Sequence, residues 1–267
     1  MKKGYLITID LDGTLIQGFD NYDIKSFELL KELSQENYIV IATGRPYRSS
    51  KYYYDILDLD TPIINYNGAL VHHPKDKGFE KIMITVPKDI IIKILNDNLD
   101  IIDNIFCEIE DDIFLYKKQD EINSYPHLDG GVLHTGNFEN TLFGDPNGAI
   151  IFSKVGSEKR LEDYINNTFK GTLKIRFWDD NEYVISEIYN PLTTKGNGLN
   201  KIIEYYNIPF EKTIAIGDGH NDIEMFENVN ISVAMGNSHP MLIEKSKYTT
   251  KDVKENGVYH FLKQYFN

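Results

Sequence analysis

The stretch "YLITIDLDGTL", residues 5–15, runs from an apolar segment directly into two acidic residues and a glycine. Its first part, 5–9, is short, continuous and apolar, which is typical of a parallel strand covered by helices on both faces. Its second part places Asp10 and Asp12 where that strand would end, and Gly13 allows the chain to turn. The stretch is therefore either an acidic turn after a buried strand or a strand that delivers a nucleophile.

The segments at both ends of the chain alternate between short apolar runs and longer runs with apolar residues at helical spacing. The first kind predicts strands at 5–9, 38–42, 62–67, 213–218 and 231–237. The second kind predicts helices at 24–37, 47–59, 198–207, 221–229 and 257–266. Alternating strands and helices predict an α/β fold with a doubly wound, mostly parallel sheet.

The middle of the chain follows another pattern, in which a helix is followed by a hairpin. This order occurs first at 87–99 and 104–118, and again at 157–169 and 172–188. It suggests an internal duplication, and because hairpins imply an antiparallel sheet, it predicts a separate inserted domain. The expected division is a core of residues 1–81 and 188–267 with an α+β insertion at 82–187.

Three details of the insertion are expected from local sequence. Ser157 is expected to cap the second helix with its side chain, and the second hairpin is expected to turn at 179–181. The Gly- and Asn-rich stretch 124–148 is expected to be mostly loop. The single cysteine, Cys107, lies in an alternating strand pattern and is expected to be packed in a core.

Composition excludes several classes of function. With 28 Lys and Arg against 41 Asp and Glu, the net charge of −13 disfavours nucleic acid and anionic membranes as partners. One cysteine allows neither an intrachain disulfide nor a multi-cysteine zinc site. No apolar run approaches the ~20 residues of a membrane span, and the N-terminus does not resemble a signal peptide. We expect a cytoplasmic protein without membrane contact.

Small, acidic or hydroxyl residues with glycines follow four of the predicted strands. They are Asp10-Leu11-Asp12-Gly13-Thr14, Thr43-Gly44-Arg45, Asn67-Gly68-Ala69 and Gly217-Asp218-Gly219-His220-Asn221-Asp222. Open parallel sheets bind ligands at the carboxyl ends of their strands, so these residues could line one crevice. Crowded carboxylates repel one another unless a cation joins them, and Mg²⁺ prefers carboxylate and carbonyl oxygens.

A carboxylate beside such a cation can attack phosphorus and form an acyl phosphate. Thr43, the Gly44 amide and a lysine could bind the remaining phosphoryl oxygens. Each motif alone is weak, and Arg45 before Pro46 reads equally well as a solvated loop charge. All four motifs in order, each at a strand end or helix start, make a strong joint case for an active site.

With Lys195-Gly196 opening a helix, these motifs resemble in order the four motifs of the haloacid dehalogenase superfamily of phosphohydrolases. The runs "IINYNGA" and "YTTKDVKENGVYHFL" are similar to its Cof-type, class IIB branch. The resemblance covers nearly the whole chain. It implies a Rossmann-like core with an α/β cap inserted between the second and third motifs.

The resemblance also implies roles for individual residues. Asp10 is the implied nucleophile, and Asp12 is the implied acid that protonates the leaving alcohol and then deprotonates the attacking water. The implied Mg²⁺ ligands are Asp10, the backbone carbonyl of Asp12, Asp218 and, directly or through a second layer, Asp222. The implied phosphate-binding residues are Thr43, Gly44, Lys195 and Asn221.

The predicted function is a Mg²⁺-dependent phosphatase for small phosphorylated metabolites, with sugar phosphates first. Two alternatives stay open: a phosphosugar mutase that uses the same aspartyl phosphate, and a sensor or scaffold that binds sugar phosphate without turnover. In the cap, His127, Asp129 and Trp178 are weaker candidates for lining the crevice. The sequence identifies no protein partner.

Overall fold

The computed structural model describes residues 2–18, 21–119, 128–178 and 183–267. Contacts divide the chain into two compact units, one of Met1–Ile82 with Thr194–Asn267 and one of Met83–Thr193. The expected turn at 179–181 and the candidate His127 lie outside the described residues. The division into a core of residues 1–81 and 188–267 and an inserted domain at 82–187 stays a prediction.

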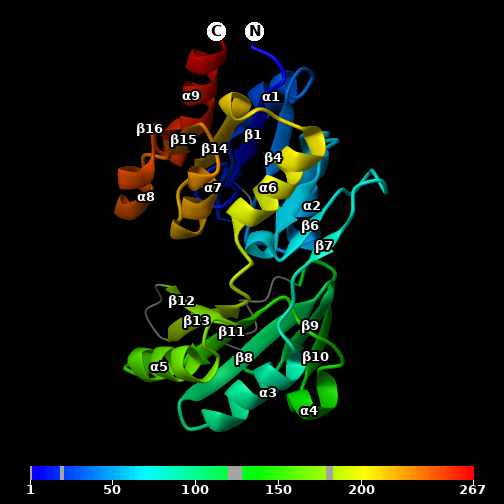
Figure 1. The fold of residues 1–267 in the computed structure, drawn as a ribbon, viewed down its shortest axis with the longest axis vertical. Coiled ribbons are helices and arrows are strands. Elements are labelled where there is room, and N and C mark those ends of the chain that lie inside the picture. Colours follow the sequence, from blue (N-terminus) through cyan, green and yellow to red (C-terminus); the bar gives the residue numbers. More distant parts are fainter. Residues whose placement is uncertain (1, 19–20, 120–127, 179–182) are drawn as a thin grey trace. The chain divides into compact units, whose positions relative to one another are not determined.

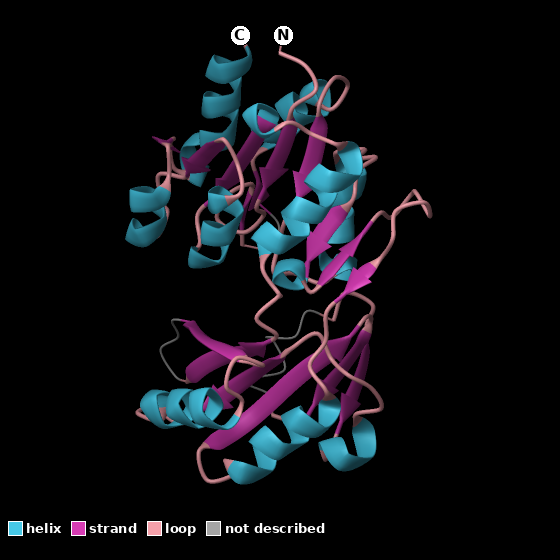
Figure 2. Cartoon of the chain, in the orientation of Figure 1, coloured by secondary structure: helices cyan, strands magenta, loops and turns pink. Residues whose placement is uncertain are grey.

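The first unit is built on a parallel sheet with the strand order β16-β15-β14-β1-β4 (Figures 1 and 2). Strand β1 lies between β14 and β4 and pairs in parallel with both. The strands of this sheet are β1 (Leu6–Ile9), β4 (Tyr38–Ile41), β14 (Thr213–Gly217), β15 (Ile231–Ala234) and β16 (Tyr248–Thr249). The α/β fold class with a mostly parallel sheet is confirmed.

Helices cover both faces of this sheet. One apolar core joins Ile7 and Ile9 of β1 to helices α1 (Ile24–Leu33), α2 (Tyr47–Ile56) and α9 (Gly257–Phe266). The other joins Leu6 to helices α6 (Lys195–Tyr206), α7 (Ile223–Glu227) and α8 (Pro240–Lys245). Burial of β1 on both faces explains its continuous apolar run, which the alternating pattern of a one-sided strand would not give.

Short elements complete the first unit beside the main sheet. Strand β5 pairs with β6, β7 follows β6 at the boundary between the units, and β2 pairs with β3. The bounds are β2 (Ile16–Gln17), β3 (Asn21–Tyr22), β5 (Ile63–Asn65), β6 (Leu70–His72), β7 (Ile82–Met83), and the 3₁₀ turns η1 (Tyr66–Gly68), η2 (Phe210–Lys212), η3 (His220–Asp222) and η4 (Val253–Glu255).

Two predicted elements of the first unit end earlier or divide. The strand expected at 62–67 ends at Asn65, because Tyr66 and Asn67 adopt left-handed φ angles of 48° and 54° and form η1. The helix expected at 221–229 is divided into the 3₁₀ turn η3 and the helix α7. Both departures lie at the carboxyl end of a strand, where a short 3₁₀ turn interrupts the regular element.

The second unit is a sheet with the order β10-β9-β8-β11-β13-β12, whose neighbours are antiparallel except for the parallel pair β9 and β10. One face packs against α3 and α5 around Ile105, Ile151 and Ile188. The bounds are α3 (Lys88–Asp97), β8 (Ile102–Ile109), β9 (Asp112–Leu115), β10 (Val132–Thr135), α4 (Phe138–Thr141), β11 (Ala149–Ser153), α5 (Glu158–Thr168), β12 (Lys174–Trp178) and β13 (Val184–Tyr189).

The described part of the stretch 124–148 is mostly irregular, as expected, and contains two short elements, strand β10 and helix α4. The expected capping of the second helix is wrong. Ser157 precedes α5, but its side chain makes no capping hydrogen bond, and its buried Oγ has no partner among the described residues. Its αR backbone differs from the extended conformation of a usual N-cap. Cys107 is buried in the apolar core, as expected.

Within the described ranges, none of the helices combines the length and apolar character that crossing a bilayer demands.

Candidate active site

Asp10 lies directly after β1, where the strand leaves the middle of the sheet. Its backbone N–H donates to the carbonyl of Ile216 at 3.0 Å, which continues the ladder with β14 by one more residue. Leu11 then turns into the apolar core, so its acidic neighbours are left at the strand end. The Asp10 side chain is 7% exposed, and burial raises the pKa of its carboxyl well above the ordinary value, with Lys195 opposing that change.

Lys195 is the first residue of α6 and is fully buried. Its Nζ donates to Asp10 Oδ1 and to Asp222 Oδ1, each at 2.6 Å. Burial lowers the pKa of a lysine, but the two carboxylates outweigh it and raise the pKa of Lys195 above its ordinary value. The lysine is therefore a fixed positive charge between two acids. Thr194 caps the helix by accepting from the Asn197 N–H at 3.0 Å.

Asp218 and Asp222 come from the loop that follows β14. Asp222 Oδ2 accepts the backbone N–H groups of Asp218 and Gly219, both at 3.0 Å, so it closes this loop upon itself. Burial and the neighbouring Asp222 raise the pKa of Asp218 to about 7, although Lys195 lowers it. Carboxylate oxygens of Asp10, Asp218 and Asp222 lie within 4.8 Å of one another.

The turn after β1 is shaped to receive the Asp218 carboxylate. Gly13 has a φ of +77°, and a Cβ there would lie 2.1 Å from Asp218 Oδ2. The Thr14 hydroxyl donates to Asp218 Oδ1 at 3.2 Å. Asn237, after β15, donates to the Gly13 carbonyl at 2.8 Å. A side chain larger than glycine at position 13 would separate these strand ends.

A second group of polar residues surrounds Asn67. Thr43 is fully buried after β4, and its carbonyl accepts the Asn67 N–H at 3.0 Å. A Cβ on Gly44 would lie 3.2 Å from Asn67 Oδ1, and the same oxygen accepts the Asn221 amide at 2.9 Å. The predicted phosphate-binding residues Thr43, Gly44 and Asn221 therefore lie together, with Asn67 between them.

Asp12 is held by Arg45. The guanidinium donates from Nε to Asp12 Oδ2 at 2.8 Å and from Nη2 to Asp12 Oδ1 at 2.6 Å. The Arg45 side chain is only 9% exposed, whereas that of Asp12 is 51% exposed. The alternative that Arg45 is a solvated loop charge is wrong, because the side chain is mostly buried and forms a two-pronged ion pair with a predicted catalytic acid.

The structure thus brings the predicted residues into three bonded groups. Asp10, Lys195, Asp218 and Asp222 form the first, Thr43, Gly44 and Asn221 the second, and Asp12 with Arg45 the third. Asn67 and Arg45 are among the strand-end residues expected to line the crevice, but the sequence assigned neither of them an individual role, and Asn237 was not among the candidates. Its position shortly after β15 is the signal that could have identified it, because ligands bind at the carboxyl ends of parallel strands.

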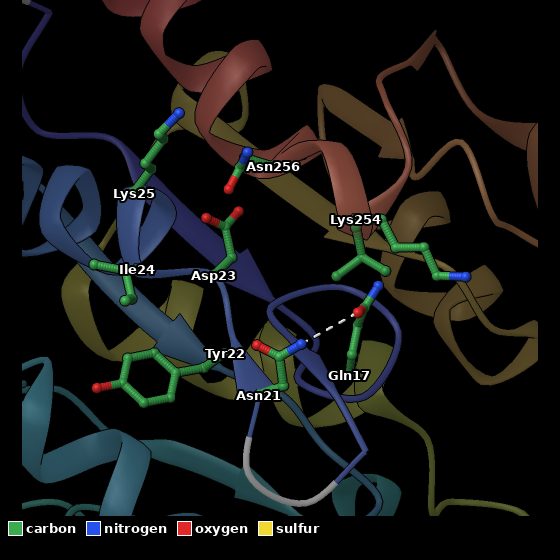
Figure 3. A pocket seen from close by; sticks show the side chains of 9 residues that line it. Gln17, Asn21, Tyr22, Asp23, Ile24, Lys25, Lys254 and Asn256 are labelled. Atoms are coloured by element: carbon green, nitrogen blue, oxygen red, sulfur yellow. Dashed lines mark hydrogen bonds between the residues drawn. The ribbon is translucent and has the colours of Figure 1, made fainter.

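A hollow of about 270 Å³ lies elsewhere in the first unit (Figure 3). Asp23, one of its residues, is occupied in capping α1 through the Ser26 N–H. The residues that line the hollow are Gln17, Asn21, Tyr22, Asp23, Ile24, Lys25, Val253, Lys254 and Asn256. None of the predicted site residues is among them, so this hollow is separate from the candidate active site.

Comparisons with known proteins identify the family of this chain. The family of haloacid dehalogenase-like hydrolases matches residues 7–262. A 5-amino-6-(5-phospho-D-ribitylamino)uracil phosphatase, YitU of Bacillus subtilis (strain 168), is 33% identical over 267 residues, which cover 99% of this chain and 98% of the relative. YwtE of the same organism, with the same named activity, is 30% identical over 286 residues, 97% of this chain and 96% of the relative.

Among solved structures, a sugar phosphatase of HAD subclass IIB superposes with a TM-score of 0.78 at 22% identity, covering 98% of each chain. At this identity the likeness concerns the fold. The chain belongs to the haloacid dehalogenase-like hydrolases, and the resemblance to the Cof-type branch is confirmed. Its activity is that of a phosphatase, the class shared by its relatives.

Proposed function

We propose that this chain is a Mg²⁺-dependent phosphatase that hydrolyses small phosphorylated metabolites, sugar or polyol phosphates first, through a phosphorylated Asp10. The observation that carries the proposal is the buried Asp10 carboxylate at the end of the central strand. Its Oδ1 accepts from Lys195, while no hydrogen bond to its Oδ2 occurs among the described residues. One oxygen is thus fixed and the other remains for attack on phosphorus.

The acidic residues fit a hard divalent cation. Three carboxylates within 4.8 Å share a single bonded lysine among the described residues. Burial, together with the neighbouring carboxylates, raises the pKa of both Asp10 and Asp218, and a bound cation would oppose this change. Asp10, Asp218, Asp222 and the backbone carbonyl of Asp12 would hold Mg²⁺. When bound, this ion would stabilise negative charge at the transferring phosphoryl group.

In the proposed reaction, an Asp10 oxygen attacks the phosphorus of the ester while the bond from phosphorus to the alcohol oxygen breaks. Asp12 gives its proton to the departing alcohol. A water molecule then attacks the aspartyl phosphate and loses a proton to Asp12, which releases phosphate and restores both acids. Lys195, Thr43, the Gly44 N–H and Asn221 would bind the phosphoryl oxygens and stabilise their developing charge.

The substrate class is proposed from the relatives. Two of them are named for a phosphorylated ribitylamino compound, which is a polyol phosphate joined to a heterocycle. The net charge of −13 suits a small anion that is captured by a local cationic site better than an extended polyanion. Sugar and polyol phosphates therefore lead the panel of compounds to be tested.

The test is phosphate release from sugar phosphates, polyol phosphates, nucleotides and 4-nitrophenyl phosphate, with Mg²⁺ or with a chelator. Asp10→Asn is nearly isosteric and should abolish turnover while the circular dichroism spectrum stays unchanged. Asp100→Asn in the second unit serves as a matched control. Near-normal turnover by a folded Asp10→Asn protein would refute the mechanism. Isomerised sugar phosphate without phosphate release would indicate the mutase, and binding without turnover would indicate the sensor.

A further inference from the structure

The ion pair of Asp12 with Arg45 has a geometry that an ordinary surface pair lacks. Two parallel N–H groups of the guanidinium reach the two oxygens of one carboxylate, at 2.8 and 2.6 Å. Such a fork fixes the plane of the carboxylate as well as its distance, which a single contact cannot do. The pair therefore determines which way the two Asp12 oxygens face.

The arginine is the fixed partner in this pair. Its backbone N–H donates to Thr43 Oγ1 at 3.1 Å, and its carbonyl accepts from the Asn65 amide at 3.0 Å and the Tyr66 N–H at 3.2 Å. Its guanidinium carbon lies 5.8 Å from the centre of the Tyr53 ring. Both the backbone and the side chain of Arg45 are therefore held by neighbouring residues, which leaves Arg45 little conformational freedom.

Asp12 is the exposed partner, with half of its side chain open to solvent. An exposed ion pair contributes little to folding, typically about 0–1 kcal/mol. The exposure has a use, however, because a leaving alcohol or a water molecule can reach the carboxylate from the open side. A buried arginine that aims an accessible acid is better suited to orientation than to stability.

We propose that Arg45 is the positioning residue for Asp12: its guanidinium holds the Asp12 carboxyl group in the one orientation in which its protonated form can give a proton to the leaving alcohol and its ionised form can take one from water. The proposal rests on the proposed function, since it assigns Asp12 the role of acid and base. Arg45 itself exchanges no proton in this scheme. Its contribution is the restriction of the Asp12 side chain to the productive rotamer.

The first test is a mutational cycle with a sugar phosphate as substrate. Arg45→Ala should lower kcat about 10- to 100-fold, the range in which a misplaced acid–base group falls, with KM nearly unchanged. In an Asp12→Asn background, the same replacement should cost almost nothing further, because the group that it orients is already lost. Arg45→Lys should recover only part of the loss, since an ammonium cannot hold both oxygens.

The second test separates the two chemical steps with 4-nitrophenyl phosphate under rapid mixing. Its leaving group needs little protonation, so Arg45→Ala should keep a burst of nitrophenol close to that of the wild type. The following steady rate should fall, because hydrolysis of the phosphoenzyme needs Asp12 as a base. General damage to the site would lower the burst and the steady rate together.

Arg160→Ala is the matched control, since Arg160 forms a similar two-pronged pair with Asp100, at 2.5 and 2.9 Å, in the second unit. It should behave as wild type. Two outcomes would overturn the proposal. One is that Arg45→Ala lowers kcat as much in the Asp12→Asn background as in the wild type. The other is that Arg45→Ala raises KM with an unchanged kcat, which would show direct contact of Arg45 with the substrate. Absence of Mg²⁺-dependent turnover in both the wild type and Arg160→Ala would instead refute the proposed function.

Discussion

Lys195 is the residue that allows the acids of the site to lie close together. Its fully buried ammonium group bridges Asp10 and Asp222, which come from two different strand ends. Removal of one partner from a buried ionic group leaves the others without compensation, and this is costlier than loss of a surface pair. Lys195 thus holds Asp10 and Asp222 together before any substrate is bound.

Replacement of this lysine by methionine should destabilise the metal-free protein by about 3 kcal/mol at pH 8, the lower end of the range for broken buried pairs. At pH 5 the loss should be smaller, because Asp10 already has a raised pKa and protonates readily once the lysine is gone. Urea unfolding at both pH values measures the difference. An equal loss at pH 5 and pH 8 would argue against electrostatic repulsion as its cause.

Asp218 gives the site a dependence on pH near neutrality. Its pKa in the folded, metal-free protein is raised from 3.8 to about 7, so ionisation opposes folding between these values. Stability from the protonated group is complete below about pH 4 and is lost as the pH rises through 7. The proposed Mg²⁺ site needs Asp218 in its ionised form, so the apparent affinity for Mg²⁺ should weaken progressively as the pH falls below 7.

Calorimetric titration of Mg²⁺ at pH 8, 7 and 6 tests this expectation. The Asp218→Asn protein, which lacks the titrating group, should bind weakly with a flatter dependence on pH. An affinity for Mg²⁺ that is constant from pH 8 to 6 in the unmodified chain would contradict it.

Residue-level reasoning found the acids of the site but not their partners. The sequence predicts Asp10, Asp12, Asp218 and Asp222 because an apolar run followed directly by carboxylates is a local pattern. The pairing of Arg45 with Asp12 joins the ends of β1 and β4, and the contact of Asn67 with Asn221 joins η1 to the loop after β14. Such pairings depend on side-chain directions across the sheet, which no local pattern contains.

At the scale of elements, the turn η1 is the piece that fits the strand β5 against the start of α6. Gly68 in this turn has a φ of +101°, and a Cβ on it would lie 2.2 Å from the Thr194 carbonyl oxygen. That oxygen accepts the Gly198 N–H in the first turn of α6. The position of Lys195 therefore depends on the absence of a side chain at residue 68.

Gly68→Ala should lower both stability and kcat, because it adds a backbone strain of order 1–2 kcal/mol and displaces the first turn of α6. Gly171→Ala is the matched control, since Gly171 has a φ of +73° with open space around its Cβ position. The control should be destabilised only by the backbone strain and should keep its kcat. Equal kcat values for the two variants, measured beside urea unfolding, would contradict the expected displacement.

Elements with a strong local signal were predictable and the others were not. The helix α9 occurs at 257–266, as expected from its apolar spacing and the preceding turn. Strand β11 was not predicted, although it lies between β8 and β13 in the second sheet. A short apolar run in a Gly- and Asn-rich region has no local feature that fixes its partners, so only tertiary pairing identifies it as a central strand.

At the scale of the whole molecule, the chain contains separate apolar cores in its two units. Two cores pack on the faces of the parallel sheet, and another packs α3 and α5 on the antiparallel sheet. Separate cores can unfold independently, and a ligand stabilises only the unit that binds it. The chain enters and leaves the second unit at 82–83 and 193–194.

Thermal unfolding should consequently show two calorimetric transitions, and Mg²⁺ should raise the Tm of only one of them. In the Asp10→Asn/Asp218→Asn variant, which lacks two proposed ligands, Mg²⁺ should shift neither transition. A single transition with equal calorimetric and van't Hoff enthalpies would show that the two units unfold as one.

The complete burial of Lys195 has a chemical consequence for the intact protein. Acylating reagents attack amines that are both accessible and unprotonated, and this ammonium is enclosed by protein and held in its charged form by Asp10 and Asp222. Lysines such as Lys159 and Lys201, whose side chains are mostly exposed, would be labelled first. The rate of acylation at residue 195, followed by mass spectrometry, would then measure how often the folded site opens to solvent.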